Sequence, residues 1–285
     1  MSGPATARDI AERLNLTKHP RSWRGRCPAC DYPGNTFSLR EKRGRTSTYC
    51  ANGCGHDQID DALSRVIADF APRPQTDDAA SDAERRAKKQ AAALRLWNGS
   101  AETGHEAYLC ARGLGDLIGS TALRFRPDCT HPEGGRYPAM VALVQDVNGA
   151  HVAAHRTYLR PDRAGKAAIE PPKASLGPVW GGAIRLHPPA AELVVGEGIE
   201  TSASAGVLIG LPAWAALSAG NLALGLKLPP EVRSVTIAAD ADSAGFQAAQ
   251  SAASRWRAEG RRVRIATPDA GGRDFNDIIM EKACG

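Results

Sequence analysis

The sequence predicts an α/β protein whose C-terminal third is a mostly parallel sheet with flanking helices. Three observations support this. From residue 192 onward, strand-like and helix-like segments alternate, an order that puts parallel strands into one sheet covered by helices. Before it, short apolar runs punctuated by turns indicate a mixed α+β segment, and the first 70 residues hold two close cysteine pairs in a polar, basic setting typical of a small β module.

The predicted domain organisation follows from these changes in pattern. Residues 1–70 form the small β module, and residues 71–82, APRPQTDDAASD, form a linker without periodicity. Residues 83–190 begin with a basic helix at 83–97 and contain a hairpin, in which 139–145 and 151–159 flank an Asn-Gly turn. Residues 191–285 contain the alternating strands and helices. We therefore expect about two cores, separated by the linker.

Charge is distributed unevenly along the chain. Residues 8–45 carry ten Lys and Arg against four Asp and Glu, and residues 83–190 carry fifteen against nine, whereas residues 191–285 carry nine against eleven. Such a surface is often merely solvated, but the first two thirds of the chain would also attract a polyanion such as nucleic acid.

The sequence favours a cytoplasmic protein without membrane contact. The N-terminus, MSGPATARDIAERL, mixes acids and bases and has no apolar core of a secretory signal. The stretch from Thr201 to Leu226 is uncharged and long enough to span a bilayer. Gly206, Gly210 and Pro212 interrupt it at positions that suit turns, so we interpret it as a buried helix followed by a buried strand.

Four of the seven cysteines have metal-ligand spacing. Cys27-Pro-Ala-Cys30 and Cys50-Ala-Asn-Gly-Cys54 are two tight knuckles that can place four thiolates around one structural Zn²⁺. The alternative is four free cysteines in a small β domain, and His56 is a reserve ligand that could replace one thiolate. The remaining cysteines have no partner spacing and are expected to be packing or surface residues: Cys110, Cys129 and Cys284.

Basic and aromatic residues surround these knuckles in the sequence. Together they suit the phosphates and stacked bases of a single strand. The basic residues are Arg24, Arg26, Arg40, Lys42, Arg43 and Arg45, and the aromatic residues are Trp23, Tyr32, Phe37 and Tyr49. Alternatively the aromatic residues fill a small core, which we expect for Phe37 and Tyr49.

Acidic residues follow three predicted strands of the C-terminal segment. VTIAAD ends in Asp240, with Asp242 two residues on, and ELVVGEG presents Glu197. Asp274 and Asp277 follow RVRIATP. Because the carboxyl ends of parallel strands meet at one edge of a sheet, these oxygens predict a catalytic Mg²⁺ or Mn²⁺ site. For Asp242 and Asp274, capping of the next helix is the alternative.

The three acidic segments resemble a known family. GEGIET, ADADSAG and RDFND are similar to the motifs of the Toprim domain, which is shared by DnaG-type primases, topoisomerases and some nucleases. The resemblance implies a Toprim-type sheet whose catalytic carboxylates are Glu197, Asp240, Asp242 and Asp277, with Asp274 as a further metal ligand. The first motif usually ends in an acid where this chain has Thr201, so a second-metal role for Glu200 is not expected.

The preceding segments are similar to DnaG-type primases in particular. YLCARGL at 108–114 resembles their Tyr-Leu-x-x-Arg-Gly-Leu, and PPKASLG resembles the Pro-Lys element before Toprim. CANGCGHDQIDDAL resembles the second knuckle of their zinc module, although Cys30 stands where a His is common and the knuckle has one extra residue. The resemblance implies a nucleic-acid groove lined by Arg112, Arg156 and Lys173. Such primases occur in phages, plasmids and integrative elements.

The expected function is therefore a DNA primase, which joins nucleoside triphosphates into short primers on single-stranded DNA for replication or transfer of a mobile element. No GKT phosphate loop occurs in the sequence, so a replicative helicase, if used, would be a separate partner. A Toprim nuclease and a catalytically idle nucleic-acid adaptor are the alternatives. The zinc module and basic middle segment argue against the first, and the intact Glu197, Asp240 and Asp242 argue against the second.

Overall fold

The structure is a computed structural model that describes residues 5–30, 35–42, 45–50, 54, 56–67, 79–268 and 273–284. Tyr32, Arg43 and most of the predicted linker lie outside the described residues, as do the side chains of Arg45 and Cys284. The chain divides into two compact units, Met1–Ala80 and Ser81–Gly285, and each is described by itself. The finer domain boundaries given above remain a prediction.

The first unit is a small antiparallel sheet with two helices. Its strands are β1 (Thr17–His19), β2 (Ser22–Gly25), β3 (Phe37–Lys42) and β4 (Arg45–Cys50), paired in that order, and its helices are α1 (Ala7–Arg13) and α2 (His56–Val66). Thr6 and Asp9 form a capping box that starts α1. The core includes Ile10, Phe37 and Leu63. Phe37 is fully buried as expected, whereas the side chain of Tyr49 is 56% exposed, so the expectation that Tyr49 fills the core is wrong.

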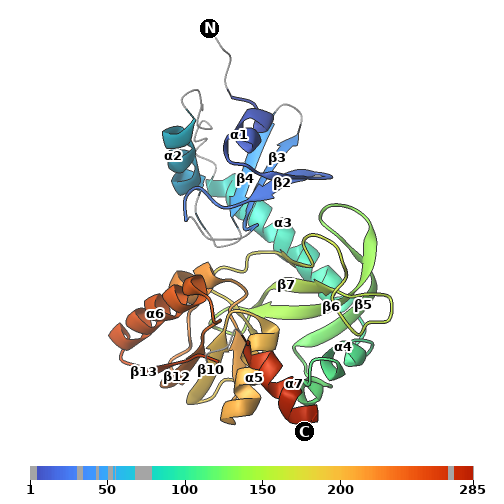
Figure 1. The fold of residues 1–285 in the computed structure, drawn as a ribbon, viewed down its shortest axis with the longest axis vertical. Helices are drawn as coiled ribbons and strands as arrows, with labels where there is room; N and C mark the ends of the chain where they lie inside the picture. Colours follow the sequence, from blue (N-terminus) through green and yellow to red (C-terminus); the bar gives the residue numbers. More distant parts are fainter. Residues whose placement is uncertain are drawn as a thin grey trace. The chain divides into compact units, whose positions relative to one another are not determined.

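The second unit contains one nine-stranded sheet in the order β13-β12-β10-β11-β9-β6-β7-β8, with β5 paired to β6 (Figure 1). The strands are β5 (Leu123–Thr130), β6 (Arg136–Gln145), β7 (His151–Tyr158), β8 (Lys173–Leu176), β9 (Ala183–Arg185), β10 (Glu192–Gly196), β11 (Ala213–Ala215), β12 (Ser234–Ala238) and β13 (Arg262–Ala266). The helices are α3 (Ala79–Asn98), α4 (Glu106–Cys110), α5 (Ile199–Ile209), α6 (Ser243–Ala258) and α7 (Phe275–Cys284), with a 3-10 turn, η1 (Gly115–Leu117), and a π turn, η2 (Asn221–Gly225).

The sheet changes character along its width. Strands β11, β10, β12 and β13 run parallel, and the remaining pairings are antiparallel. The predicted mostly parallel C-terminal sheet is thus confirmed. It also continues into the antiparallel strands of the preceding segment, because β9 pairs with both β11 and β6. The predicted boundary near residue 190 therefore falls inside one continuous sheet.

Helices pack against the parallel strands in two groups. Helix α5 contacts α7 and strands β10 and β11, whereas α6 contacts η2 and strands β12 and β13 (Figure 1). Ile199, Ala203 and Ile279 share a core cluster with Val194 of β10. The uncharged stretch Thr201–Leu226 forms most of α5, then β11 and η2, as interpreted from its turn residues. In the part of the chain that the structure describes, no helix has both the length and the apolar character to cross a membrane.

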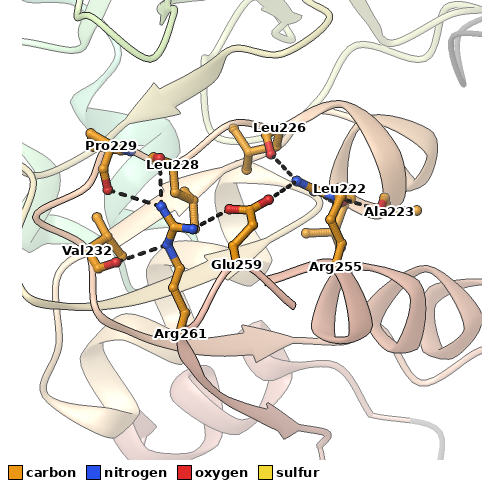
Figure 2. A network of polar contacts seen from close by, with 9 residues as sticks. All are labelled: Leu222, Ala223, Leu226, Leu228, Pro229, Val232, Arg255, Glu259 and Arg261. Carbon is orange, nitrogen blue, oxygen red and sulfur yellow. Dashed lines mark hydrogen bonds and ion pairs between the residues drawn. The ribbon is translucent and has the colours of Figure 1, made fainter. Parts of the chain in front are cut away.

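Two arginines fasten the connection between β11 and β12 (Figure 2). Arg255 donates hydrogen bonds to the carbonyl oxygens of Leu222, Ala223 and Leu226, and Arg261 donates to those of Leu228, Pro229 and Val232. The carboxylate of Glu259 lies between the two guanidinium groups and pairs with both. Charge-assisted bonds of this kind satisfy backbone carbonyls that no helix or strand pairs. They hold in place a segment that begins beside the acidic strand ends.

Candidate functional site

The four cysteines of the first unit form a cluster suited to zinc. The Sγ atoms of Cys27, Cys30, Cys50 and Cys54 all lie within 4.8 Å of one another. The Cys27–Cys54 and Cys30–Cys50 sulfur distances are 3.9 and 3.8 Å. Four sulfurs placed tetrahedrally about 2.3 Å from one Zn²⁺ are about 3.8 Å apart, so the geometry fits this ion. His56, the reserve ligand, is exposed and is not a member of the cluster.

Two of these thiols, those of Cys27 and Cys54, are hard to ionise without a cation because their pKa values are raised. The pKa of Cys54 is raised to about 12, first by burial and then by the neighbouring sulfur of Cys30. The pKa of Cys27 is also raised, by its hydrogen bond with Cys50 and by burial. Zinc-bound cysteines are thiolates, so metal binding would supply the charge that stabilises them.

Near the cluster, the basic residues expected to bind nucleic acid differ in exposure. Arg26 is exposed and Arg24 is partly exposed. The ammonium of Lys18, which was not among the predicted residues, lies 3.4 Å from the centroid of the Trp23 ring. A contact of this kind leaves the ring edge available while the cation covers one face. A nucleic-acid role for Arg24, Arg26, Arg43 and Arg45 stays a prediction.

In the second unit, the strand ends bring the predicted acids together. Gly196 of β10 is opposite Ala238 of β12 in a parallel register, so the two strands end level with each other. Glu197 and Asp240 therefore follow neighbouring strands at one edge of the sheet. These residues, with Asp242 and Asp274, line a cavity of about 340 Å³. Three basic side chains line the same cavity: Arg112, Lys166 and Lys173.

The carboxylates that line the cavity are close enough to repel one another. Burial, and then the charge of Asp240, raise the pKa of Glu197 to about 7, although Lys173 opposes the shift. Burial is also the largest cause of the raised pKa of Asp240, and Asp242 adds to it. Carboxylates that are both desolvated and close to one another are stabilised by a cation, and hard oxygen ligands suit Mg²⁺ or Mn²⁺. The donor set therefore fits a divalent ion held by Glu197, Asp240 and Asp242, with Asp274 beside them.

The carboxylates surround the cavity and do not converge as the cysteines do. Within the described ranges, close grouping of three or more possible metal ligands is confined to the four cysteines. Side-chain rotation of the carboxylates would therefore accompany ion binding. A hydrogen bond from the N–H of Ala219 to its carboxylate limits this rotation for Glu197. Its backbone carbonyl accepts from the N–H of Leu217 at 2.7 Å, which fixes the main chain there. Leu217 has a left-handed φ of 75°, an unfavourable conformation for a leucine beside a site.

Two of the acidic positions also cap helices. The Oδ1 atom of Asp242 accepts from the N–H of Gly245 at 2.7 Å and starts α6. Asp274 and Asp277 cap α7 reciprocally, since each carboxylate accepts from the other's backbone N–H. The capping alternative is thus observed for Asp242 and Asp274. Asp277, expected to be a catalytic carboxylate, is not among the cavity-lining residues. Its carboxylate accepts from the N–H of Asp274 at 2.9 Å, and its metal role stays a prediction.

Asp240 is held from two sides. The hydroxyl of Thr201, in the first turn of α5, donates to its Oδ1 at 3.1 Å. Gly245 permits the first turn of α6 to approach, because a Cβ there would lie 3.0 Å from the Cβ of Asp240 and 3.1 Å from its carbonyl oxygen. Ala or any larger residue at position 245 would push Asp240 away from its present place.

Arg156 is hydrogen-bonded to the backbone of other strands. Its side chain is buried, and its three guanidinium nitrogens donate to the carbonyl oxygens of Ala174, Thr130 and Ser175 at 3.1–3.2 Å. These bonds join β7 to β8 and to the end of β5. The donors of Arg156 are thus engaged by the protein's own backbone, and its place in a nucleic-acid groove stays an untested prediction.

Lys173 and Arg112 line the cavity. The carbonyl oxygen of Arg112 accepts from Nδ2 of Asn276 at 2.7 Å, and the same amide contacts Oγ of Ser204 at 3.1 Å. Asn276 is buried, so α7 holds the Arg112 segment against α5. The nucleic-acid role of Arg112 and Lys173 stays a prediction.

Sequence reasoning missed His155 and Lys166, which line the cavity, and the contact of Tyr108 with the cavity residue Glu200. Glu200 is buried and accepts hydrogen bonds from the hydroxyl of Tyr108 and, at 2.7 Å, from Nζ of Lys166. Burial opposes ionisation of Glu200, but Lys166 and Lys173 outweigh it and hold its pKa well below the ordinary value. Lys166 lies in the turn PDRAGKAA, which has no motif that could have marked it.

Comparison with known proteins gives two family matches. Residues 192–284 match the Toprim domain, and residues 87–186 match a domain of unknown function (DUF7146). A search of curated proteins returned no match. The expected Toprim motifs thus lie within a segment that matches this family, and the expected fold class is confirmed.

Solved structures that match this chain include three bacterial primases. The Escherichia coli primase catalytic core is 18% identical, with a TM-score of 0.40, over 61% of this chain and 67% of that one. A primase domain from Pseudomonas aeruginosa is 18% identical, with a TM-score of 0.37, over 61% of this chain and 54% of that one. The zinc-binding and RNA polymerase domains of the Aquifex aeolicus primase are 16% identical, with a TM-score of 0.48, over 99% of this chain and 83% of that one. The chain thus spans about half to four fifths of their lengths.

Proposed function

We propose that this chain, whose residues 192–284 form a Toprim domain, is a DNA primase that joins nucleoside triphosphates into short primers on single-stranded DNA. One observation carries the proposal. The same cavity is lined by cations and by carboxylates that follow the parallel strands: Arg112, Lys166 and Lys173, and Glu197, Asp240, Asp242 and Asp274. Nucleotidyl transfer needs this pairing, because a polyphosphate must be held beside ligands for a divalent ion.

The reaction joins the 3′-hydroxyl oxygen of one nucleotide to the α-phosphorus of the next. The bond from that phosphorus to the β-phosphate oxygen breaks, pyrophosphate leaves, and the hydroxyl proton passes to water. A bound Mg²⁺ or Mn²⁺ would neutralise the charge that develops at the α-phosphate. Arg112 and Lys173 bind phosphate oxygens and hold the triphosphate in place. Thr201 and the backbone at Leu217 and Ala219 orient Asp240 and Glu197 toward it.

The template, the helicase and the cellular setting are proposed on the same basis. The zinc cluster keeps the first unit folded, and Arg24 and Arg26 contact the template through phosphates, which position a strand without specifying its sequence. The protein acts in the cytoplasm, in replication or transfer of a mobile element, and a replicative helicase would supply the single-stranded template. The basic charge of residues 8–45 and 83–190 supports nucleic acid as the main partner.

Primer synthesis can be tested directly. The zinc-loaded chain is incubated with single-stranded DNA, γ-labelled nucleoside triphosphates and Mg²⁺ or Mn²⁺. We expect short products that retain the γ-label at their 5′ ends, because primers begin with an intact triphosphate. D240N is the matched control and should reduce the yield by about a hundredfold or more, as loss of an electrostatic contact at a reaction centre commonly does. Cut template without labelled product would identify a nuclease, and neither product would identify a binding protein.

A further inference from the structure

Glu200 is an acid inside the cavity that is engaged by protein cations. It lies in the first turn of α5, three residues after Glu197, and only 9% of the residue is exposed. Its Oε1 accepts from the hydroxyl of Tyr108, in α4, and pairs with Nζ of Lys166 at 2.7 Å. Three segments that are distant in sequence therefore meet at one carboxylate. A carboxylate committed to these donors is poorly placed to bind a metal ion as well.

The backbone fixes the position of Lys166. It follows β7 in a hydrogen-bonded turn, in which Leu159 and Lys166 form an isolated β-bridge and the N–H of Arg160 donates to the carbonyl of Gly165 at 2.9 Å. The N–H of Ala167 donates to the carbonyl of Tyr158 at the same distance. The backbone of Lys166 is thus fixed, and the ion pair with Glu200 already restricts its side chain, so less side-chain entropy is lost when it binds a second group.

The ammonium of Lys166 remains accessible from the cavity. Its side chain is 28% exposed, whereas that of Glu200 is 12% exposed. An ammonium has three N–H donors, so Glu200 leaves donors for another acceptor. Lys173 also acts on Glu200, so two ammonium groups share one carboxylate and this wall of the cavity stays positive. The same cavity is lined by Glu197, Asp240 and Asp242, whose crowded charge favours a divalent ion.

We propose that Lys166, held in place by Glu200 and Tyr108, binds the phosphates of the incoming nucleoside triphosphate. Lys166 is then a substrate-binding residue, and Glu200 and Tyr108 are positioning residues that keep its ammonium turned into the cavity. The inference rests on the proposed function, since it names the residue that receives the substrate of the same site. A purely structural ion pair is the competing explanation, because it would fasten the turn after β7 to α5.

The test separates charge from packing. K166M keeps the length of the side chain but removes the charge, and it leaves the buried Glu200 without its ion-pair partner. The double variant K166M/E200Q is neutral at both positions and avoids that unpaired carboxylate, so it should regain stability. R160M is the matched control, because Arg160 belongs to the same turn, is 51% exposed and pairs with Asp162 outside the cavity.

Affinity is measured by displacement of a fluorescent ATP analogue with ATP, inorganic triphosphate or AMP, on the zinc-loaded full chain with no Mg²⁺ or Mn²⁺ added. Under these conditions only the Lys and Arg side chains of the protein can neutralise the phosphates. We expect K166M to weaken ATP and triphosphate binding about tenfold or more, as loss of a charged hydrogen bond does, with a smaller effect on AMP. K166M/E200Q should recover its melting temperature but not its affinity, K166R should keep part of the affinity, and R160M should match the parent.

Two results would overturn the inference. One is a folded K166M whose triphosphate affinity and nucleotide KM lie within twofold of the parent. The other is recovery of affinity together with stability in K166M/E200Q, which would make the pair structural. If the parent chain binds triphosphate through Lys166 but makes no primers, the inference stands and the primase proposal fails. If it makes primers and K166M has an unchanged KM, this inference alone fails.

Discussion

The hydroxyl of Thr201 lies 3.1 Å from Oδ1 of Asp240 and donates a hydrogen bond to it. This bond connects the first turn of α5 to the end of β12 and so joins two of the three acidic segments. It favours the ionised form of Asp240 against burial, which raises the pKa of that carboxyl. Thr201 therefore influences Asp240 through a hydrogen bond, although its own side chain is uncharged.

Replacing Thr201 by Val should weaken Mn²⁺ binding to the cavity by a few fold. The exchange keeps the shape of the side chain and removes one hydrogen bond, worth about 1 kcal/mol. The melting temperature should change little. Calorimetric Mn²⁺ titration of the zinc-loaded chain measures the effect, and T201S, which keeps the hydroxyl, is the control. Equal Mn²⁺ affinity in T201V and the parent would contradict the positioning role.

Asp242 should show two separable roles. It caps α6 through Gly245, and Asn is as good a capping residue as Asp, so D242N should melt close to the parent. D242A loses the cap and should be less stable by about 1 kcal/mol. Both should lose primer synthesis, because both lose the carboxylate. Thermal unfolding and primer yield are measured side by side. An active D242N would limit Asp242 to capping.

The zinc cluster should bind about one Zn²⁺ per chain, because its four sulfurs lie within 4.8 Å of one another and two of the pairs are 3.8 and 3.9 Å apart, as one tetrahedral site requires. C50S should release the metal and unfold the first unit, whose small core depends on it. The unfolding transition of residues 81–285 should remain. Elemental analysis and thermal melting measure this, with C110S as a control outside the cluster. A folded, zinc-free first unit would be inconsistent with a structural metal.

Arg156 should matter for stability and not for DNA binding. R156M leaves the carbonyls of Ala174, Thr130 and Ser175 without their donor and should cost about 3 kcal/mol, since each buried unpaired group is unfavourable. Well below its melting temperature, the variant should bind single-stranded DNA within twofold of the parent. K173M should show the reverse, weaker binding with a reduced salt dependence. A stable R156M with weak DNA binding would return Arg156 to the groove.

His155 should make the second unit acid-sensitive. Burial is the main cause, with Lys173 and Arg156 adding to it and Glu200 opposing, and together they lower the pKa of His155 to about 3. Its Nδ1 lies 2.9 Å from Oγ of Ser175. An unfolded histidine has a pKa of about 6.5, so the neutral ring contributes stability above pH 6.5 that is lost as pH falls toward 3.

The loss should approach about 1.4 kcal/mol per pH unit below pH 6, relative to H155Q, which does not titrate. Urea unfolding at pH 7.5 and 5.5, followed by tryptophan fluorescence, gives this difference, and the other histidines cancel because both proteins contain them. Parallel pH profiles for the parent and H155Q would show that His155 is not held neutral.

The sequence by itself determined the features that depend on local spacing. Cysteines on tight knuckles at 27–30 and 50–54 predicted the cluster, because each knuckle brings two thiols together and two such pairs are typical of one zinc site. Alternation of strands and helices after residue 192 predicted the parallel sheet, and parallel strands necessarily end at a common edge, which placed Glu197, Asp240 and Asp242 around one cavity.

Only the tertiary structure decided which charged groups are engaged by the protein itself. Arg156 and Lys173 both looked like groove residues, yet the first is buried among carbonyls of β5 and β8 and the second lines the cavity. Asp277 caps the helix α7. Tyr108 and Glu200, which share a hydrogen bond, are 92 residues apart in the sequence. The physical reason is that burial and hydrogen-bond partners are set by packing between distant segments, for which spacing along the chain carries no information.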